Sequence, residues 1–186
     1  DYYYIDHAYF FKSKHNNHPS FNDRFYRITK NNENINYLTN DKMNNFIKDR
    51  VTSFKRITSL SYNPYKKRGD NILVCPPSEY VSRYYKLQSV DHWINKTIEE
   101  IKKYSDRPIA IRNKKTERAL EQDLSNAHCI ISFQSTVAIQ AILKGIPSIS
   151  DKCSSVYPIS ESDISKIEQL ENLKEEDVNN LIENLL

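Results

Sequence analysis

The chain has 186 residues, with 27 Lys or Arg against 24 Asp or Glu, so its formal net charge is +3. This length suffices for one large domain or two small ones with a hydrophobic core. The charge is too small to require a nucleic-acid partner, and there is no run of about 18 apolar residues that would span a membrane. The sequence has no basic and apolar leader, and because it starts at Asp1 without a methionine, we expect a piece of a longer protein.

Cysteine and glycine usage narrows the class of protein. The three cysteines, Cys75, Cys129 and Cys153, are odd in number, lack the spacing of a metal site and in two cases lie in apolar runs. They predict reduced core thiols and hence a cytoplasmic protein. The chain has only two glycines and neither a glycine-rich dinucleotide fingerprint nor a P-loop, which disfavours NAD enzymes and P-loop ATPases.

The amino-terminal segment, residues 1–65, is irregular and rich in asparagine. Its β-rich start predicts one strand that ends before Asp6 and His7, residues 25–29 predict a second strand, and residues 41–57 predict a weakly amphipathic helix. A histidine can act as a general base near neutral pH, and a neighbouring carboxylate can orient it. Asp6 and His7 are therefore candidate catalytic residues, with a structural or surface role as the alternative.

A regular alternation begins after residues 62–70, where Pro64 and Gly69 mark a boundary. The predicted strands are residues 71–75, 107–111, 129–132 and a short run around Ile149. Helices alternate with them: a short one capped by Ser78, one at residues 90–104, one near 117–124, one that starts near Ser135, and two at 160–170 and 174–186. This order predicts an α/β fold, a Rossmann-like parallel sheet with helices on both faces.

Residues 128–150 carry the strongest signals in this half. The predicted strand is followed by a polar turn in which Ser135 or Thr136 can cap a helix. Gly145 lies where a left-handed helix stop is needed, and the inward side of the helix would be formed by Ala138, Ala141 and Ile142. A helix that starts at the carboxyl end of a parallel strand offers free amides and a positive dipole end, which suit a phosphate or diphosphate. The alternative is that the two hydroxyls only cap the helix.

Several short motifs resemble glycosyltransferases of the GT-B architecture. The run QSTVAIQAILKGIPSIS, from Gln134, is similar to the run in capsule-polysaccharide transferases where a Ser pair opens a helix and a Gly-x-Pro leads to the next strand. RPIAIRNK, from Arg107, lies where that group has a strand ending in Arg or Lys, and YIDHAYF, from Tyr4, resembles an acidic turn of their amino-terminal half. The order of these motifs, together with YRIT and ILVCPPSE, resembles phage-encoded glycosyltransferases.

The resemblance implies a partial amino-terminal, acceptor-side lobe in residues 1–65 and a nucleotide-sugar donor lobe in residues 66–186. It also implies that the helix start holds the donor phosphates and that the basic strand end neutralises them. The donor-binding residues would then be Arg112, Lys114, Gln134, Ser135, Thr136 and Gln140. Two positions depart from the pattern, because Gln140 replaces a Glu that often holds the donor ribose and Asn113 stands where a His is common.

The implied function is transfer of a sugar from a nucleotide sugar, as co-substrate, to a hydroxyl acceptor without a metal ion. Arg112 and Lys114 would help to stabilise the departing phosphate, and Asp6 or His7 would take the acceptor's proton. The acceptor would be a hydroxymethylated base in phage DNA, whose phosphates the basic residues 66–68 would meet, or a surface glycan. A viral protein would act in the host cytoplasm. The alternative is a non-catalytic Rossmann-like module that binds nucleotides or nucleic acid.

Overall fold

A computed structural model describes residues 3–7, 26–30 and 61–185 of the chain. The chain divides into two compact units, one of residues 1–60 together with 182–186, and one of Ser61–Leu181. No helix among the described residues combines the length and apolar character needed to cross a membrane.

The first unit contains a two-stranded antiparallel ribbon. Strand β1 (Tyr3–His7) pairs with β2 (Tyr26–Lys30), and Asp6 lies opposite Arg27 in the register. Two strands were predicted here, and β2 starts one residue later than the aromatic pattern indicates. Asp6 and His7 are the last two residues of β1 instead of following it. The helix predicted at residues 41–57 lies outside the described residues.

The second unit is built on a four-stranded, entirely parallel sheet, which confirms the predicted α/β fold. Its strands are β3 (Asn71–Cys75), β4 (Ile109–Ile111), β5 (Ala127–Ser132) and β6 (Ser148–Ser150), in the spatial order β4-β3-β5-β6. All six residues of β5 are buried. A parallel strand covered on both faces is expected to be a continuous apolar run instead of an alternating one, which explains the composition of β3 and β5.

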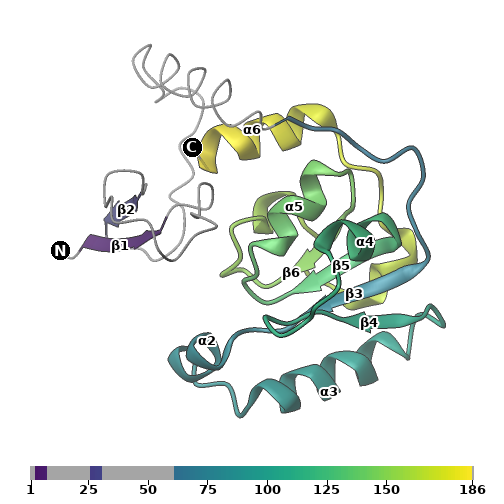
Figure 1. Ribbon diagram of the computed structural model, residues 1–186, viewed down its shortest axis with the longest axis horizontal. Helices are drawn as coiled ribbons and strands as arrows, with labels where there is room; N and C mark the ends of the chain where they lie inside the picture. Colours follow the sequence, from purple (N-terminus) through teal and green to yellow (C-terminus); the bar gives the residue numbers. More distant parts are fainter. Residues whose placement is uncertain (1–2, 8–25, 31–60, 186) are drawn as a thin grey trace. The chain divides into compact units, whose positions relative to one another are not determined.

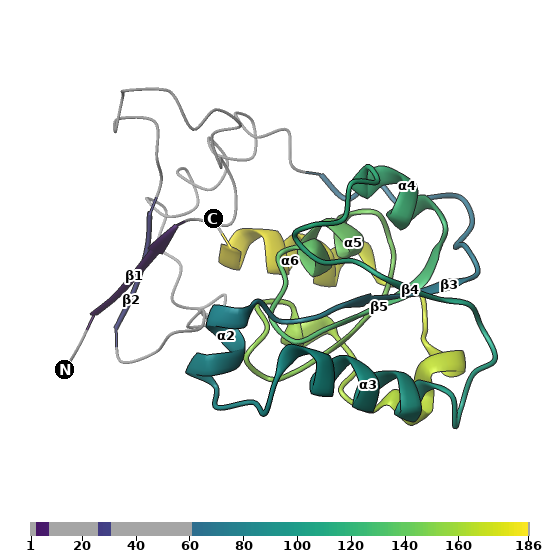
Figure 2. The same cartoon turned by 60° about the horizontal axis from the view of Figure 1, so that its bottom comes forward.

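Helices cover both faces of this sheet. Helix α3 (Val90–Ile101) lies on one face, and α4 (Leu120–Ser125) and α5 (Val137–Leu143) lie on the other, as Figure 1 and Figure 2 show. The short helix α2 (Glu79–Tyr84) precedes α3 and, as predicted, is capped by Ser78, whose Oγ accepts from the Val81 N–H at 3.3 Å. Connections between parallel strands are almost always right-handed, so the direction in which the chain crosses the sheet decides which face the connecting helix covers. The chain moves one way from β3 to β4, through α3, and the opposite way from β4 to β5 and β6, through α4 and α5.

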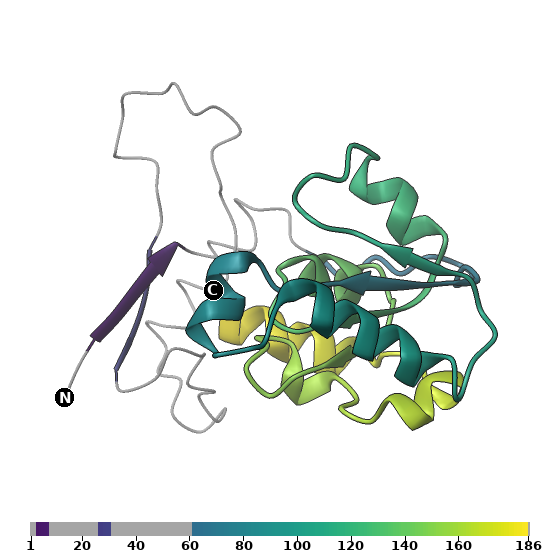
Figure 3. The ribbon, with the colours of Figure 1, turned by 90° about the horizontal axis from the view of Figure 1, so that it is seen from below.

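On the α3 face of the sheet, one hydrophobic core contains residues of the strands, of α3 and of the segment that follows β6. Figure 3 shows α3 lying along the sheet when this face is viewed from below. The buried residues of this cluster are Ile72, Val74, Ile101, Cys129, Ile131, Ile149 and Ile167. Residues of β3, β5 and β6 thus share one core with Ile167, which lies between β6 and the last helix, α6 (Glu175–Leu185).

The single helix predicted for residues 160–170 is wrong in its first part. Glu161 instead forms an isolated parallel bridge with Ile149, in which the Ser150 N–H donates to the Glu161 carbonyl at 2.9 Å. That pairing extends the backbone, so the helical part of residues 160–170 is limited to the 3-10 segment η4 (Ile164–Gln169). A separate 3-10 segment, η3 (Tyr157–Ile159), precedes the bridge. Asp163 caps η4 by accepting from the Ser165 N–H at 2.9 Å.

We expect Gly145→Ala to destabilise the protein. Gly145 ends α5 with φ of +74°, and a Cβ there would lie 2.6 Å from the Pro64 Cβ. The left-handed conformation alone costs about 1–2 kcal/mol for an L residue, and the close contact adds to this cost. Urea unfolding measures the change, with Gln140→Ala on the exposed side of α5 as a control that stays within about 0.5 kcal/mol. If the two variants are equally stable, the left-handed conformation and close packing of Gly145 do not restrict the residue at this position.

Candidate functional site

The sheet has a topological switch point between β3 and β5. From β3 the chain moves outward to β4, whereas from β5 it moves to β6 in the opposite direction. Cys75 pairs with Ser132 at the last position of these two strands, so the loops that follow them start side by side. Open α/β sheets bind ligands in the crevice outside the carboxyl ends of such strands, which makes this edge the candidate site.

The turn between β5 and α5 is organised by two serines. Ser132 Oγ accepts from the Ser135 N–H at 2.9 Å, and Ser135 Oγ accepts from the Val137 N–H at 3.2 Å. The N-cap residue of α5 is Thr136, and its side chain makes no cap hydrogen bond; the hydroxyl that accepts from the first amide of the helix is that of Ser135, one residue earlier. A hydroxyl that accepts one hydrogen bond still has its own hydrogen to donate, so Ser135 can bind the Val137 amide and also contact an anion.

Arg112 follows β4 at the same edge of the sheet, where its N–H donates to the Val74 carbonyl at 2.9 Å. Its guanidinium is held from inside the protein: Nη1 lies 2.5 Å from Asp123 Oδ2 and donates to the Arg118 carbonyl at 3.0 Å. Asp123 also pairs with Arg118, and its side chain is only 6% exposed. Burial raises the pKa of Asp123, but the hydrogen bonds from Arg118 and Arg112 outweigh it and hold the pKa below its ordinary value.

The remaining predicted donor residues are distributed around this edge. Lys114 is exposed in a tight turn after β4, which Asn113 organises by accepting from the Lys115 N–H at 2.9 Å. Gln134 is partly buried in the turn that precedes α5, whereas Thr136 and Gln140 are exposed at the start and on the outer side of α5. The predicted catalytic residues Asp6 and His7 belong to the other unit.

A pocket of about 340 Å³ opens at the carboxyl ends of β5 and β6, on the α3 side of the sheet. Sequence reasoning missed it, because its walls come from segments that are far apart along the chain. Its lining residues include Trp93 and Thr97 of α3, Phe133 after β5, Asp151 and Lys152 after β6, and Tyr157. Phe133 directly precedes the turn that leads into α5, so the pocket adjoins that turn.

The wall of the pocket is a set of edge-to-face aromatic contacts. The rings of Trp93 and Phe133 lie 6.5 Å apart at 83°, and Tyr85 packs against the other side of Phe133 at 5.2 Å and 76°. Such contacts add to the energy of simple burial and hold the rings in place. The pocket therefore presents aromatic side chains that are held in place beside polar groups.

The three cysteines do not contribute a nucleophile. Cys75, Cys129 and Cys153 are unpaired and buried. Burial raises the pKa of each thiol to about 12. They stay protonated at neutral pH and act as small core residues, because the thiolate is the reactive form.

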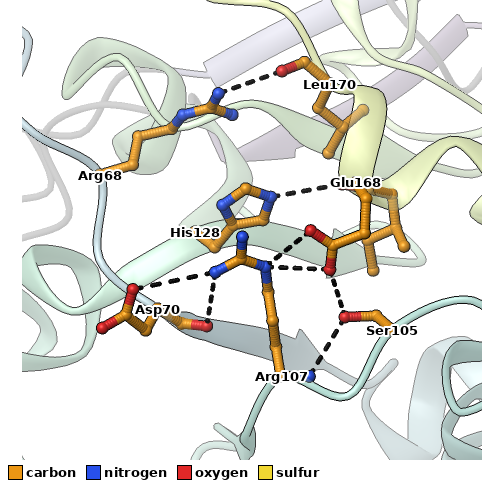
Figure 4. Close-up of polar contacts among 8 residues, drawn as sticks. Arg68, Asp70, Ser105, Arg107, His128, Glu168 and Leu170 are labelled. Atoms are coloured by element: carbon orange, nitrogen blue, oxygen red, sulfur yellow. Dashed lines mark hydrogen bonds and ion pairs between the residues drawn. The ribbon is translucent and has the colours of Figure 1, made fainter.

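The opposite, amino-terminal end of the sheet carries a polar network that joins β4 to η4, shown in Figure 4. Arg107 Nε donates to both carboxylate oxygens of Glu168 at 3.0 Å, and its Nη1 lies 3.8 Å from Asp70 Oδ1. His128, only 8% exposed, donates from Nε2 to the Ile167 carbonyl at 3.3 Å, and Arg68 donates to the Leu170 carbonyl at 3.1 Å. The bonds to Ile167, Glu168 and Leu170 tie strand ends to η4 and the residue after it, and the contact with Asp70 links the starts of β4 and β3, so this network stabilises the fold.

Comparison with known proteins leaves the chain without an identified relative, because no family profile, curated protein or solved structure matches it.

We expect Asp123→Ala to destabilise the protein by roughly 2–3 kcal/mol, which is less than for a fully buried pair because Arg118 is partly exposed. The variant leaves Arg112 without its carboxylate partner in a site where the Arg112 side chain is only 15% exposed. Urea unfolding provides the measurement, and Asp106→Ala, at an exposed position, is the control. A variant as stable as the wild type would show that the ion pair contributes nothing.

The free energy of unfolding should depend on pH through His128. Burial, together with the nearby Arg107 and Arg68, lowers the pKa of His128 below its ordinary value. At pH values between the lowered pKa of His128 in the folded protein and about 6.5, the unfolded chain binds more protons than the folded protein does. The free energy of unfolding therefore falls as the pH drops through that window. His128→Gln should reduce the slope between about pH 7.5 and 5.5, as measured by urea unfolding. Identical slopes in the two proteins would exclude this role for His128.

Proposed function

We propose that the chain is the donor-binding part of a glycosyltransferase of the GT-B type, which transfers a sugar from a nucleotide sugar to a hydroxyl acceptor. One observation carries the proposal: the Ser135 turn lies at the switch point of a parallel sheet and adjoins a pocket of about 340 Å³. The turn could bind a phosphate group and the pocket could bind a larger group next to it. A ligand with these two parts would be an activated nucleotide. Ligands of this class favour such an edge because amides and helix starts meet there.

The chemistry of sugar transfer requires stabilisation of negative charge on the departing phosphate. In the proposed reaction the bond between the anomeric carbon and the phosphate oxygen breaks, and that oxygen takes the electron pair. Groups that are already oriented toward this oxygen lower the barrier, because they do not reorganise as the charge develops. The start of α5 and the Ser135 hydroxyl would supply such groups without a metal ion.

Two cations would complete the phosphate site in different ways. Both bonds that Arg112 makes use Nη1, and a guanidinium has five N–H donors, so Arg112 keeps donors for an anion while Asp123 orients it. Lys114 is exposed and would move onto the phosphates when the donor binds. Arg112 would therefore act as an oriented donor and Lys114 as a mobile one.

The acceptor side of the proposal rests on sequence resemblance alone. Asp6 or His7 would serve as the base that accepts the hydroxyl proton as the new glycosidic bond forms. The acceptor would be a hydroxymethylated base in phage DNA or a surface glycan, and only the first would show affinity that weakens with rising salt.

Thermal or urea unfolding in the presence of UDP-, GDP- and CMP-sugars tests the donor part. A donor at about 100 times its dissociation constant should raise the free energy of unfolding by about 2.7 kcal/mol. Lys114→Ala should weaken that binding at least about tenfold, or about 1.4 kcal/mol. Lys102→Ala is the matched control, because Lys102 is an exposed lysine at the carboxyl end of α3 and lies outside the pocket. No stabilisation by any of the sugars would reject the transferase and favour a non-catalytic interaction module.

A further inference from the structure

We propose that the pocket between β5, β6 and α3 receives the nucleoside end of the donor, and that Asp151 is the carboxylate that recognises its ribose hydroxyls. This inference rests on the proposed function. It differs from the expectation drawn from the motif in α5, where position 140 would contact the ribose. Gln140 is exposed and is not among the residues that line the pocket.

The aromatic wall suits a flat heteroaromatic ring. Trp93, Phe133 and Tyr157 all line the pocket, and Trp93 and Phe133 hold each other edge to face. Phe133 is buried behind this wall, whereas Trp93 is partly exposed and Tyr157 is exposed. A nucleobase can gain by stacking on Trp93 or Tyr157 whatever its hydrogen-bonding pattern, because every base has a π-face. The contact between Phe133 and Tyr85 fixes this wall before a ligand arrives.

The charges of the pocket fit a neutral group and not a phosphate. Asp151 and Lys152, one of each sign, are the only charged side chains among its lining residues. A diphosphate inside the pocket would therefore meet a carboxylate, whereas the Ser135 turn outside offers amide and hydroxyl donors. The phosphates consequently belong over the Ser135 turn, and the uncharged nucleoside belongs in the pocket.

Asp151 is held in a defined position for this role. Its Oδ1 accepts from the Cys153 N–H at 3.1 Å, which fixes the side chain in the loop after β6. An ionised carboxylate has about four acceptor sites, so it can accept further hydrogen bonds from the vicinal hydroxyls of a ribose. Such charge-assisted bonds are stronger than those an amide can make.

The full chain permits a direct test, because Trp93 is its only tryptophan and its fluorescence reports on the pocket wall. UDP, GDP and CMP are each compared with the 2′-deoxy counterpart by calorimetry and by Trp93 fluorescence. The nucleotide that binds should change the fluorescence and should bind at least about tenfold more tightly than its 2′-deoxy form. Asp151→Asn, which retains the acceptor for the Cys153 amide, should largely remove this preference, whereas Gln140→Ala should retain it.

The outcomes separate this inference from the function on which it rests. Nucleotide binding without a change in Trp93 fluorescence, or with a ribose preference that Asp151→Asn leaves intact, overturns the inference and leaves the transferase proposal standing. If no nucleotide and no nucleotide sugar binds the wild type, the proposed function fails and the inference fails with it. The wild-type comparison requires no variant to fold, so a poorly folded Asp151→Asn does not prevent a decision.

Discussion

The parallel pairing of β3 with β5 is the interaction on which the rest of the structure depends. These two strands form the centre of the sheet, and their registered ends, Cys75 and Ser132, place the following loops next to each other. Their burial on both faces makes a change of register costly, because it would expose apolar side chains and leave ladder groups unpaired. The position of the Ser135 turn, and therefore of the candidate site, follows from this pairing.

The two ends of the sheet have different roles. At the amino end, Arg107, Glu168 and His128 form a network that attaches η4 to the strands. Ile164, at the start of η4, lines the pocket at the other end, so the network also supports one wall of that pocket. The carboxyl end carries an oriented arginine, the Ser135 turn and a pocket. Polar groups that are satisfied internally stabilise the fold, whereas those with spare hydrogen-bonding capacity are available to a ligand.

Part of the candidate site could be predicted from local sequence patterns. The Ser135 turn was predicted because a cap and the helix it starts lie within a few residues of each other. Arg112 was predicted at the strand end, but its partner Asp123 was not, since an ion pair eleven residues away depends on how α4 packs. The pocket could not be predicted at all, because Trp93, Phe133 and Asp151 meet only when α3, β5 and β6 are assembled.

What the sequence determined by itself is the series of strands and helices from Asn71 to the short strand around Ile149, the cap at Ser78 and the left-handed stop at Gly145. These features depend on periodicity, capping and backbone conformation, which act over a few residues. The tertiary structure alone decided the strand order, the bridge from Ile149 to Glu161 that replaced a predicted helical turn, and the convergence of the pocket walls. These depend on contacts between distant segments, whose energies become available only after the chain has paid the entropy of bringing them together.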